Sequence, residues 1–200
     1  MKLYFTPGAC SVAPHIVLEE LGLPFELVQV DLKEKKTETG EDYLAINSKG
    51  YVPALQLDNG DLLTEGLVIS QYIADLKPAE NLVPSSGEAR YQLQSLMVFI
   101  STEIHKPMGS MFNPKQSADA RASTETLLNK RLTWIADTLG NNDYLFNNQF
   151  SIADAYLFTV LNWAGFVEFD LSPWPTLQAF SARIAERPAT QAALKAEGLI

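Results

Sequence analysis

The sequence predicts an α/β domain followed by an all-helical domain, and three observations support this prediction. Strand-like and helical segments alternate through residue 76, whereas only helical patterns occur beyond residue 87. Residues 77–86 separate the two parts and have a turn-forming composition. The acidity also divides there, since 6 basic and 13 acidic residues occur up to Glu80, against 9 and 11 after it. We therefore expect domains at residues 1–80 and 87–200.

The order of elements in the first domain predicts a mixed sheet. We expect a strand at Lys2–Phe5, a helix at Ser11–Leu21, a strand at Phe25–Leu32, a hairpin of Val52–Leu57 with Leu62–Thr64, and a helix at Glu65–Leu76. The segment before the hairpin is expected to be irregular. Asn59 and Gly60 suit a two-residue hairpin turn, because both tolerate a positive φ angle.

Apolar residues at helical spacing form three stripes in the second domain. They are Leu93, Met97, Ile100 and Ile104; Leu128, Leu132, Ile135 and Leu139; and Leu177, Phe180 and Ile184. A further buried helix is expected to start at Ser151, since Ser151 and Asp154 have the spacing of a capping box, which contributes about 1 kcal/mol. The nearly apolar stretch that follows is too short and too polar to span a membrane.

Charge and composition exclude several classes of function. A net charge of −9 argues against a nucleic acid or an anionic membrane as a partner, because either would need a basic surface. One cysteine, Cys10, cannot form an internal disulfide, and no signal-like segment precedes the first strand, so we expect a cytoplasmic protein. Two histidines and one cysteine far apart in the sequence do not predict a metal site.

Cys10 lies at the turn from the first strand to the first helix, where its thiol would face the positive end of the helix dipole. Cysteines in such positions have pKa values lowered to about 3.5–7.5, so this placement favours a functional thiol over an inert core residue. The position three residues on is Ala13, so no resolving cysteine is present. A disulfide at Cys10 must therefore join another molecule.

Val52 and Pro53 precede the hairpin strand and allow two interpretations. Pro53 is either an ordinary loop proline, or it follows a cis peptide bond in a turn that leaves the main chain of Val52 unpaired beside Cys10. In the second case Val52 can bind an extended peptide as an additional strand.

Six motifs occur in order along the chain and are more specific together than any one of them. They are Lys2-Leu3-Tyr4, Pro7-Gly8-Ala9-Cys10-Ser11, Val52-Pro53-Ala54-Leu55, Leu63-Thr64-Glu65-Gly66, Thr102-Glu103-Ile104-His105-Lys106 and Ser151-Ile152-Ala153-Asp154-Ala155-Tyr156. With them the chain resembles the bacterial beta-class cytosolic glutathione transferases. The resemblance implies a thioredoxin-like first domain, an all-helical second domain, and a homodimer that conjugates glutathione to apolar electrophiles in detoxification. It also implies that Cys10 contacts the glutathione sulfur and can form a mixed disulfide with it.

The same resemblance assigns the main glutathione contacts to the first domain. It implies that Val52, beside Pro53, pairs with the cysteinyl unit through its main chain, and that Glu65 and the Gly66 amide hold the γ-glutamyl end. The chemistry fits, because Glu65 can bind an ammonium group while amides at a helix start receive a carboxylate.

Lys35 matches the family's lysine for the glycyl carboxylate. Lys33 and Lys36 flank it, however, and a run of charges is usually a solvated face. Two positions depart from the family pattern: Val98 replaces an asparagine, and Ser48 replaces a proline in the loop that enters Val52. We therefore expect one polar contact to be lost and this loop to be looser.

Thr102, Glu103 and His105 occupy one turn of the first long helix in the second domain. The resemblance assigns Thr102 and Glu103 to glutathione binding and His105, with Cys10, to catalysis. It leaves open whether Glu103 acts in its own subunit or across the dimer. His105 can equally be a hydrogen-bonded histidine between the domains, and His15, which has no matching role, is expected to be structural.

The sequence thus predicts a glutathione transferase that uses bound glutathione as its nucleophile. Conjugation needs an ionised glutathione sulfur, for which Cys10 and His105 are the nearest donors and the hydroxyls of Tyr4 and Ser11 are rivals. A glutathione-dependent thiol–disulfide oxidoreductase is the second possibility. A non-catalytic binding protein of the same architecture is the third, and the combination of thiol, proline turn and acidic helix start argues against it.

Overall fold

The structure, a computed structural model, describes residues 1–200 as two compact units. The first unit consists of Met1–Val83 together with Arg187–Ile200, and the second is Pro84–Glu186. Each unit has its own buried core, so each is described separately.

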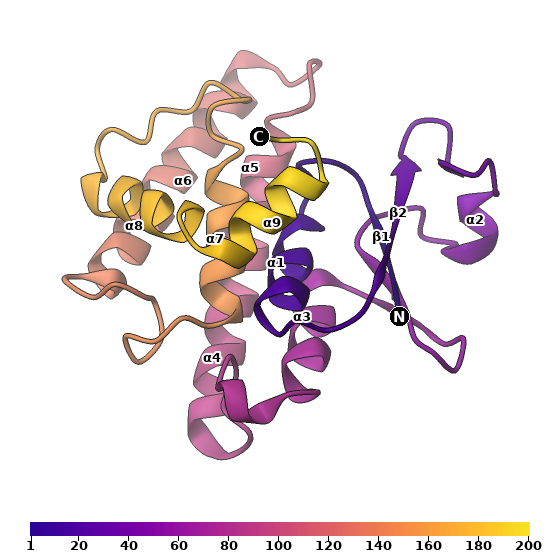
Figure 1. Cartoon of the computed structure of the whole chain (residues 1–200). Coiled ribbons are helices and arrows are strands. Elements are labelled where there is room, and N and C mark those ends of the chain that lie inside the picture. The colour runs from indigo at the N-terminus through magenta and orange to yellow at the C-terminus, as the bar shows by residue number, and fades with distance from the viewer. The chain divides into compact units, whose positions relative to one another are not determined.

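The C-terminal segment differs from the expected second domain, 87–200, because it belongs to the first unit. Helix α9 (Pro188–Ala196) packs against helix α1 (Val12–Glu20), as Figure 1 shows for the yellow and indigo helices. The guanidinium group of Arg187 binds both carboxylate oxygens of Glu20, at 2.6 and 2.9 Å. A two-pronged pair of this kind fixes geometry as well as charge, and no short-range sequence pattern reveals it.

The first unit contains a mixed sheet, as predicted. Its strands are β1 (Lys2–Phe5), β2 (Glu26–Asp31), β3 (Lys36–Thr37), β4 (Ala54–Gln56) and β5 (Leu62–Thr64), and its other helices are α2 (Tyr43–Ile46), α3 (Gly66–Asp75) and a 3₁₀ turn at Pro78–Glu80. The strand order is β3-β2-β1-β4-β5, with β1 and β2 parallel and every other pair antiparallel. This is the thioredoxin-like arrangement expected for the first domain.

Two details of the first unit differ from the prediction. The segment expected to be irregular contains β3 and α2, and the Asp42 side chain starts α2 by accepting a hydrogen bond from the Leu44 amide at 3.0 Å. The hairpin turn has three residues rather than two, because Leu57 and Asp61 close it and only Gly60 has a positive φ angle. A turn followed by one left-handed glycine is the usual solution for that loop length.

The core of the first unit lies where its helices meet the sheet. Helices α1 and α3 pack against each other, and α3 also packs on β4 and β5. Leu3 and Leu55 are paired across β1 and β4 and are completely buried, as are Ile16 of α1 and Ile69 and Ile73 of α3. Ile69 and Ile73 are four residues apart, so they share the inner face of their helix.

The second unit is all-helical, as predicted. Its helices are α4 (Gly87–Phe99), α5 (Lys106–Ser110), α6 (Ala118–Leu139), α7 (Ile152–Leu161) and α8 (Pro175–Ala185), with a turn of π-helix at Ile100–His105 between α4 and α5. Every residue of the three predicted apolar stripes is buried. Their spacing of three and four residues therefore identified the core faces of these helices correctly.

Helix α7 starts with the predicted capping box. The Asp154 carboxylate accepts hydrogen bonds from the amide and the hydroxyl of Ser151, both at 2.8 Å, and from the Leu145 amide at 2.8 Å. All residues of α7 are buried, so this carboxylate satisfies donors that water does not reach. Across the whole chain, no helix combines the length and the apolar character needed to cross a membrane.

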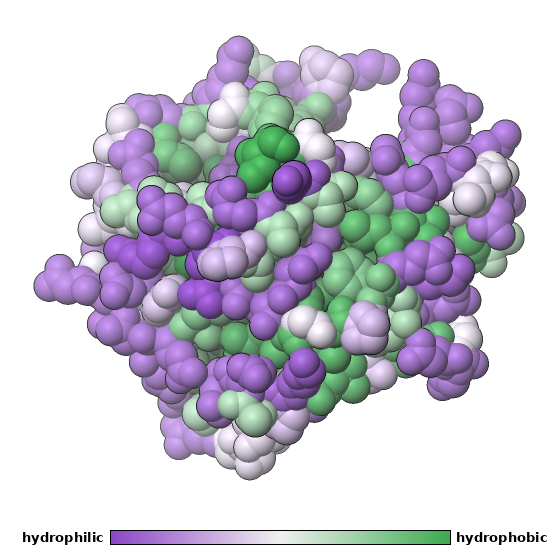
Figure 2. Space-filling model, viewed as in Figure 1, coloured by the Kyte–Doolittle hydropathy of each residue, from purple (hydrophilic) through white to green (hydrophobic).

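Figure 2 shows hydrophilic residues around much of the molecular face, with hydrophobic areas between them. The C-terminal end of the chain carries the exposed apolar residues Leu199 and Ile200. Single exposed apolar residues of this kind are common on protein surfaces.

Candidate functional site

The register of the sheet brings the predicted site segments of the first unit to one end. The last part of β1, which leads to Cys10, pairs with the start of β4, and the start of β4 pairs with the end of β5. Val52 and Pro53 come directly before β4, and Glu65 and Gly66 come directly after β5. These residues therefore lie at the end of the sheet where β1 leads to the cysteine.

Cys10 contacts Val52, but the pKa of its thiol is raised, whereas the sequence predicted a lowered pKa. The Sγ atom donates a hydrogen bond to the Val52 carbonyl oxygen at 3.3 Å. Burial raises the pKa of Cys10 to about 11, and the negative charge of Glu65 adds to the rise. The prediction of a low thiol pKa is therefore wrong. The loss of water on burial destabilises the thiolate by more than the start of the helix stabilises it. Cys10 is a neutral hydrogen-bond donor near neutral pH.

The rival hydroxyls of Ser11 and Tyr4 are committed to the fold. Ser11 directly precedes α1 rather than lying within it, and its buried side chain bonds the amide and the carbonyl of Thr6, both at 3.3 Å, without capping the helix. Tyr4 is buried as well, its hydroxyl donates to Gln56 Oε1 at 3.4 Å, and burial raises its pKa. Cys10, which is partly exposed, is better placed than either hydroxyl to meet a ligand.

The loop that carries Val52 is held by two side chains. The peptide bond between Val52 and Pro53 is cis. The preceding carbonyl, of Tyr51, accepts hydrogen bonds from the Tyr43 hydroxyl at 2.8 Å and from Asn47 Nδ2 at 2.9 Å. The loop is thus anchored although serine replaces the family's proline within it. Of the two interpretations, the second correctly gave the cis bond but expected an unpaired Val52 carbonyl, whereas this carbonyl accepts a hydrogen bond from the Cys10 thiol.

Glu65 and Gly66 place the start of α3 beside the proline. A Cβ atom on Gly66 would lie 3.4 Å from Pro53 Cγ, so glycine permits this close approach. Glu65 has a φ angle of 69°, a left-handed conformation that is uncommon for a residue with a side chain. Its exposed carboxylate lies 2.8 Å from Lys49 Nζ, which also donates to Thr64 Oγ1 at 2.9 Å.

Lys35 is distinguished from its two lysine neighbours by its contacts. It is partly buried, whereas Lys33 and Lys36 are exposed. Lys35 Nζ donates to the Gly50 carbonyl oxygen at 2.8 Å and lies 5.9 Å from the centre of the Tyr51 ring. Its ammonium group is therefore held against the same loop that leads to the proline.

Glu197 is a residue of this region that sequence reasoning missed. Its carboxylate is buried, accepts a hydrogen bond from the Gly8 amide at 3.0 Å and lies 2.8 Å from His15 Nδ1. Through these contacts the end of the chain supports the turn that carries Cys10. His15 is also buried between aromatic rings, in agreement with its expected structural role.

Thr102 and Glu103 lie in the π-helical turn of the second unit and bond to their own unit. The Thr102 hydroxyl donates to the Val98 carbonyl oxygen at 3.1 Å. Glu103 Oε2 lies 2.6 Å from Arg131 Nε of α6. π-helical turns occur frequently at functional sites, but the contacts of these two side chains are explained locally.

His105 ends the π-helical turn within a group of aromatic side chains. Its Nδ1 atom lies 2.5 Å from the Tyr156 hydroxyl, and its ring meets that of Trp163 edge-on at a centroid distance of 4.9 Å. Phe112, which is half exposed, meets Trp163 at 5.7 Å. Burial lowers the pKa of His105 to about 4, and the charge of Lys106 adds to this effect. His105 is therefore a neutral imidazole at physiological pH.

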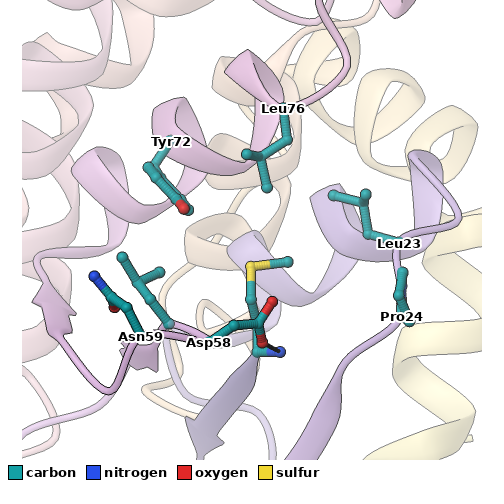
Figure 3. Close-up of a pocket in the computed structure, with 8 residues that line it drawn as sticks. Leu23, Pro24, Asp58, Asn59, Tyr72 and Leu76 are labelled. Carbon is teal, nitrogen blue, oxygen red and sulfur yellow. Dashed lines mark hydrogen bonds and ion pairs between the residues drawn. The ribbon is translucent and has the colours of Figure 1, made fainter.

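A separate pocket of about 440 Å³ is shown in Figure 3. It lies at the start of β1, whereas Cys10 follows the end of that strand. It is lined by Met1, Leu23, Pro24, Leu57, Asp58, Asn59, Tyr72 and Leu76. The terminal ammonium of Met1 pairs with Asp58 at 2.6 Å. None of the predicted site residues lines this pocket, and the chain has no group of His, Cys, Asp and Glu side chains suited to a metal ion.

Comparisons with known proteins place both units in one family. Residues 8–76 match the family model for the glutathione S-transferase N-terminal domain, and residues 96–188 match that for the glutathione S-transferase C-terminal domain. The chain is 46% identical over 200 residues to glutathione S-transferase GstA of Escherichia coli O157:H7, with 100% of both chains covered.

Two solved structures match over the whole chain. The bacterial beta class glutathione S-transferase of Sphingomonas chungbukensis has 45% identity and a TM-score of 0.95, with 100% of each chain covered. A sphingomonad glutathione S-transferase complexed with glutathione has 46% identity and a TM-score of 0.95, again with 100% of each chain covered.

Proposed function

Because the chain belongs to the bacterial beta class of glutathione S-transferases, we propose that Cys10, Val52 and Glu65 form the binding site for its glutathione. The protein is an enzyme that conjugates glutathione, which serves as its co-substrate. The observation that supports the proposed site is the sheet register, which brings a thiol, an edge main chain and an acidic helix start to one end of the first unit.

Glutathione lies across this end of the sheet in an extended form. Its cysteinyl unit pairs with the main chain of Val52 after the cis bond to Pro53, in the manner of an added strand. Its γ-glutamyl ammonium binds Glu65, while the carboxylate beside it faces the Gly66 amide, which has no partner within its helix. Its glycyl carboxylate binds Lys35.

Cys10 acts as a hydrogen-bond donor to the glutathione sulfur. In the unliganded chain the thiol donates to the Val52 carbonyl. When the cysteinyl amide of glutathione takes that carbonyl, the thiol is released and turns to the ligand. A neutral donor stabilises the glutathione thiolate without losing its own proton, which fits the raised pKa of Cys10.

The second candidate activity is thiol–disulfide exchange, favoured by the partly exposed single thiol. Here the Cys10 thiolate attacks glutathione disulfide, so that a Cys10–glutathione disulfide forms and one glutathione thiolate leaves. The raised pKa of Cys10 keeps the attacking form scarce near neutral pH, so we rank conjugation first.

The electrophile is apolar and binds against the aromatic group of the second unit. Phe112 offers a half-exposed ring, and the neutral His105 adds an uncharged polar contact. The assignment of Thr102 and Glu103 to glutathione binding rests on the resemblance alone, since both side chains bond within the second unit.

We also propose that the enzyme is a cytoplasmic homodimer with a role in detoxification. The free thiol suits a reducing compartment, and exposed apolar residues lie on α3 (Val68), directly after α3 (Leu76) and on α4 (Tyr91 and Val98). Light scattering at micromolar concentration should give about twice the chain mass of 22.1 kDa. A species of single-chain mass would contradict the dimer.

Calorimetry with glutathione tests the binding site through a matched pair of lysines. Replacing Lys35 with Met should weaken binding by roughly tenfold, because a charge-assisted contact is lost. Replacing the exposed neighbour in Lys33→Met should leave binding unchanged. Equal affinities in the two variants would show that the glycyl carboxylate binds elsewhere.

A further inference from the structure

Lys49 and Glu65 form an exposed ion pair, of which the glutathione contacts described above use Glu65 but not Lys49. Their side chains are 52% and 65% exposed, and Lys49 Nζ lies 2.8 Å from Glu65 Oε1. An exposed pair of this kind contributes little to stability, because water screens both charges. Stability alone is therefore a weak explanation for a lysine held beside this glutamate.

The hydrogen bonds of the pair leave one donor and one acceptor side by side. A lysine ammonium has three protons, and Lys49 gives one to Glu65 Oε1 and one to Thr64 Oγ1. Glu65 is bonded through Oε1, so Oε2 remains as an acceptor for a ligand. The pair thus presents a positive donor next to a negative acceptor. The donor can bind the carboxylate of an α-amino acid, and the acceptor can bind its ammonium group.

Both residues are held in place by their backbones. The Lys49 amide donates to the Asn47 side chain at 3.2 Å, in the same loop that Asn47 ties to the Tyr51 carbonyl. Glu65 occupies its left-handed conformation directly before α3. Such backbone conformations persist where the surrounding structure fixes them, often at ligand sites.

We infer that Lys49 is a specificity-determining residue that binds the α-carboxylate of the γ-glutamyl unit, while its partner Glu65 binds the α-ammonium group. The pair is then a receptor for the complete α-amino acid end of the ligand rather than for an amine alone. This inference rests on the proposed binding of glutathione at Glu65, and it adds a side-chain cation to the amides at the start of α3.

Two ligands that differ in one carboxylate test the assignment. The first is S-methylglutathione, and the second is its analogue with 4-aminobutyrate in place of the γ-glutamyl unit, which keeps the ammonium but lacks the α-carboxylate. Binding of each is measured by ligand-observed nuclear magnetic resonance, which reaches millimolar affinities, to the wild type, Lys49→Gln and the control Lys33→Gln. Thermal unfolding confirms that the variants remain folded.

The expected result is that Lys49→Gln weakens S-methylglutathione by about tenfold but leaves the carboxylate-free analogue unchanged. Lys33→Gln should change neither affinity. Equal weakening of both ligands would overturn the assignment and make Lys49 a positioning residue for Glu65. Unchanged or tighter binding of S-methylglutathione would overturn it by showing that Lys49 is a bystander or a competitor for Glu65.

A Glu65→Gln variant separates this inference from the proposed function. If Glu65→Gln binds both ligands as the wild type does, the γ-glutamyl end does not lie at Glu65 and the proposed site itself fails. If Glu65→Gln weakens both ligands while Lys49→Gln weakens neither, only the inference about Lys49 fails.

Discussion

The sheet end of the first unit and the aromatic group of the second unit, the two regions of the proposed function, differ in the chemistry that they present. The sheet end presents main-chain atoms and charges, whose positions follow from the strand register and from loop anchors such as the hydrogen bonds of two side chains to the Tyr51 carbonyl. Around His105, the groups are rings in contact, and the histidine has lost its charge to burial. The first arrangement suits one peptide of fixed chemistry, whereas the second suits apolar molecules of varied shape.

In both regions, burial keeps an ionisable side chain neutral, although one side chain is an acid and the other is a base. Burial raises the pKa of Cys10, an acid, and lowers that of His105, a base, so both side chains are neutral near pH 7. Neither of the two predicted catalytic residues then carries a charge of its own. The reactive charge of the conjugation reaction must therefore reside on the bound glutathione.

The largest expected effect concerns Cys10 and separates the two enzymatic activities. Cys10→Ala should abolish thiol–disulfide exchange, because no second cysteine exists to replace it. Conjugation should fall but remain measurable, since glutathione itself supplies the nucleophile. Cys10→Ser, which keeps a donor but not the thiol, should also lose exchange and should conjugate faster than Cys10→Ala. Steady-state assays of both activities check this, and full conjugation in Cys10→Ala would show that the thiol is a bystander.

The next effect concerns the protonation of His105 and the stability of the enzyme. Well above the unfolded pKa of 6.5, the imidazole is neutral in both states and contributes nothing to the pH dependence. As the pH falls from 6.5 towards 4, the unfolded chain binds a proton that the folded chain does not, so the free energy of unfolding falls by up to about 3 kcal/mol. Urea unfolding at pH 7.5 and 4.5 should show a larger acid loss in the wild type than in His105→Gln. Parallel losses would contradict a buried neutral imidazole.

Much of the fold was predictable because its signals are local. The helical stripes ending at Leu139 and Ile184 and the capping box at Ser151 each follow from residues three or four positions apart. The sequence predicted a mixed sheet but not its strand order, because β1 pairs with β4, which lies far along the chain.

The sequence identified candidate site residues by the chemistry of their side chains, but it did not reveal contacts between distant segments or the effects of burial. Glu197 was missed because it is 189 residues from Gly8, and no periodic pattern links the end of the chain to that turn. The pKa of Cys10 was predicted with the wrong sign because the helix end is visible in the sequence, whereas the removal of water depends on packing. Lys49 was missed because its partner Glu65 lies on another loop.

A smaller effect is expected on the alkylation rate of Cys10, which reports the protonation of its thiol. With a pKa of about 11, the thiolate fraction at pH 7.5 is on the order of a hundredfold below that of an unperturbed thiol, and the greater nucleophilicity of a high-pKa thiolate offsets part of this. Iodoacetamide should therefore alkylate the unliganded enzyme at least about tenfold more slowly than a model thiol. Mass spectrometry over time follows the reaction. A rate equal to or above that of the model thiol would restore the low pKa that the sequence suggested.

The smallest expected effect concerns Glu103, for which the resemblance and the contacts of the second unit give different answers. If Glu103 serves only as the partner of Arg131, Glu103→Gln should leave glutathione affinity within about twofold and change the free energy of unfolding by less than about 1 kcal/mol, since the pair is partly exposed. Arg131→Gln should then behave in the same way. If Glu103 instead binds the ligand's ammonium group, in its own subunit or across a dimer, Glu103→Gln should weaken binding by roughly tenfold while Arg131→Gln does not. We expect the first result, because the carboxylate already has a cation at 2.6 Å, and calorimetry on the two variants decides between them.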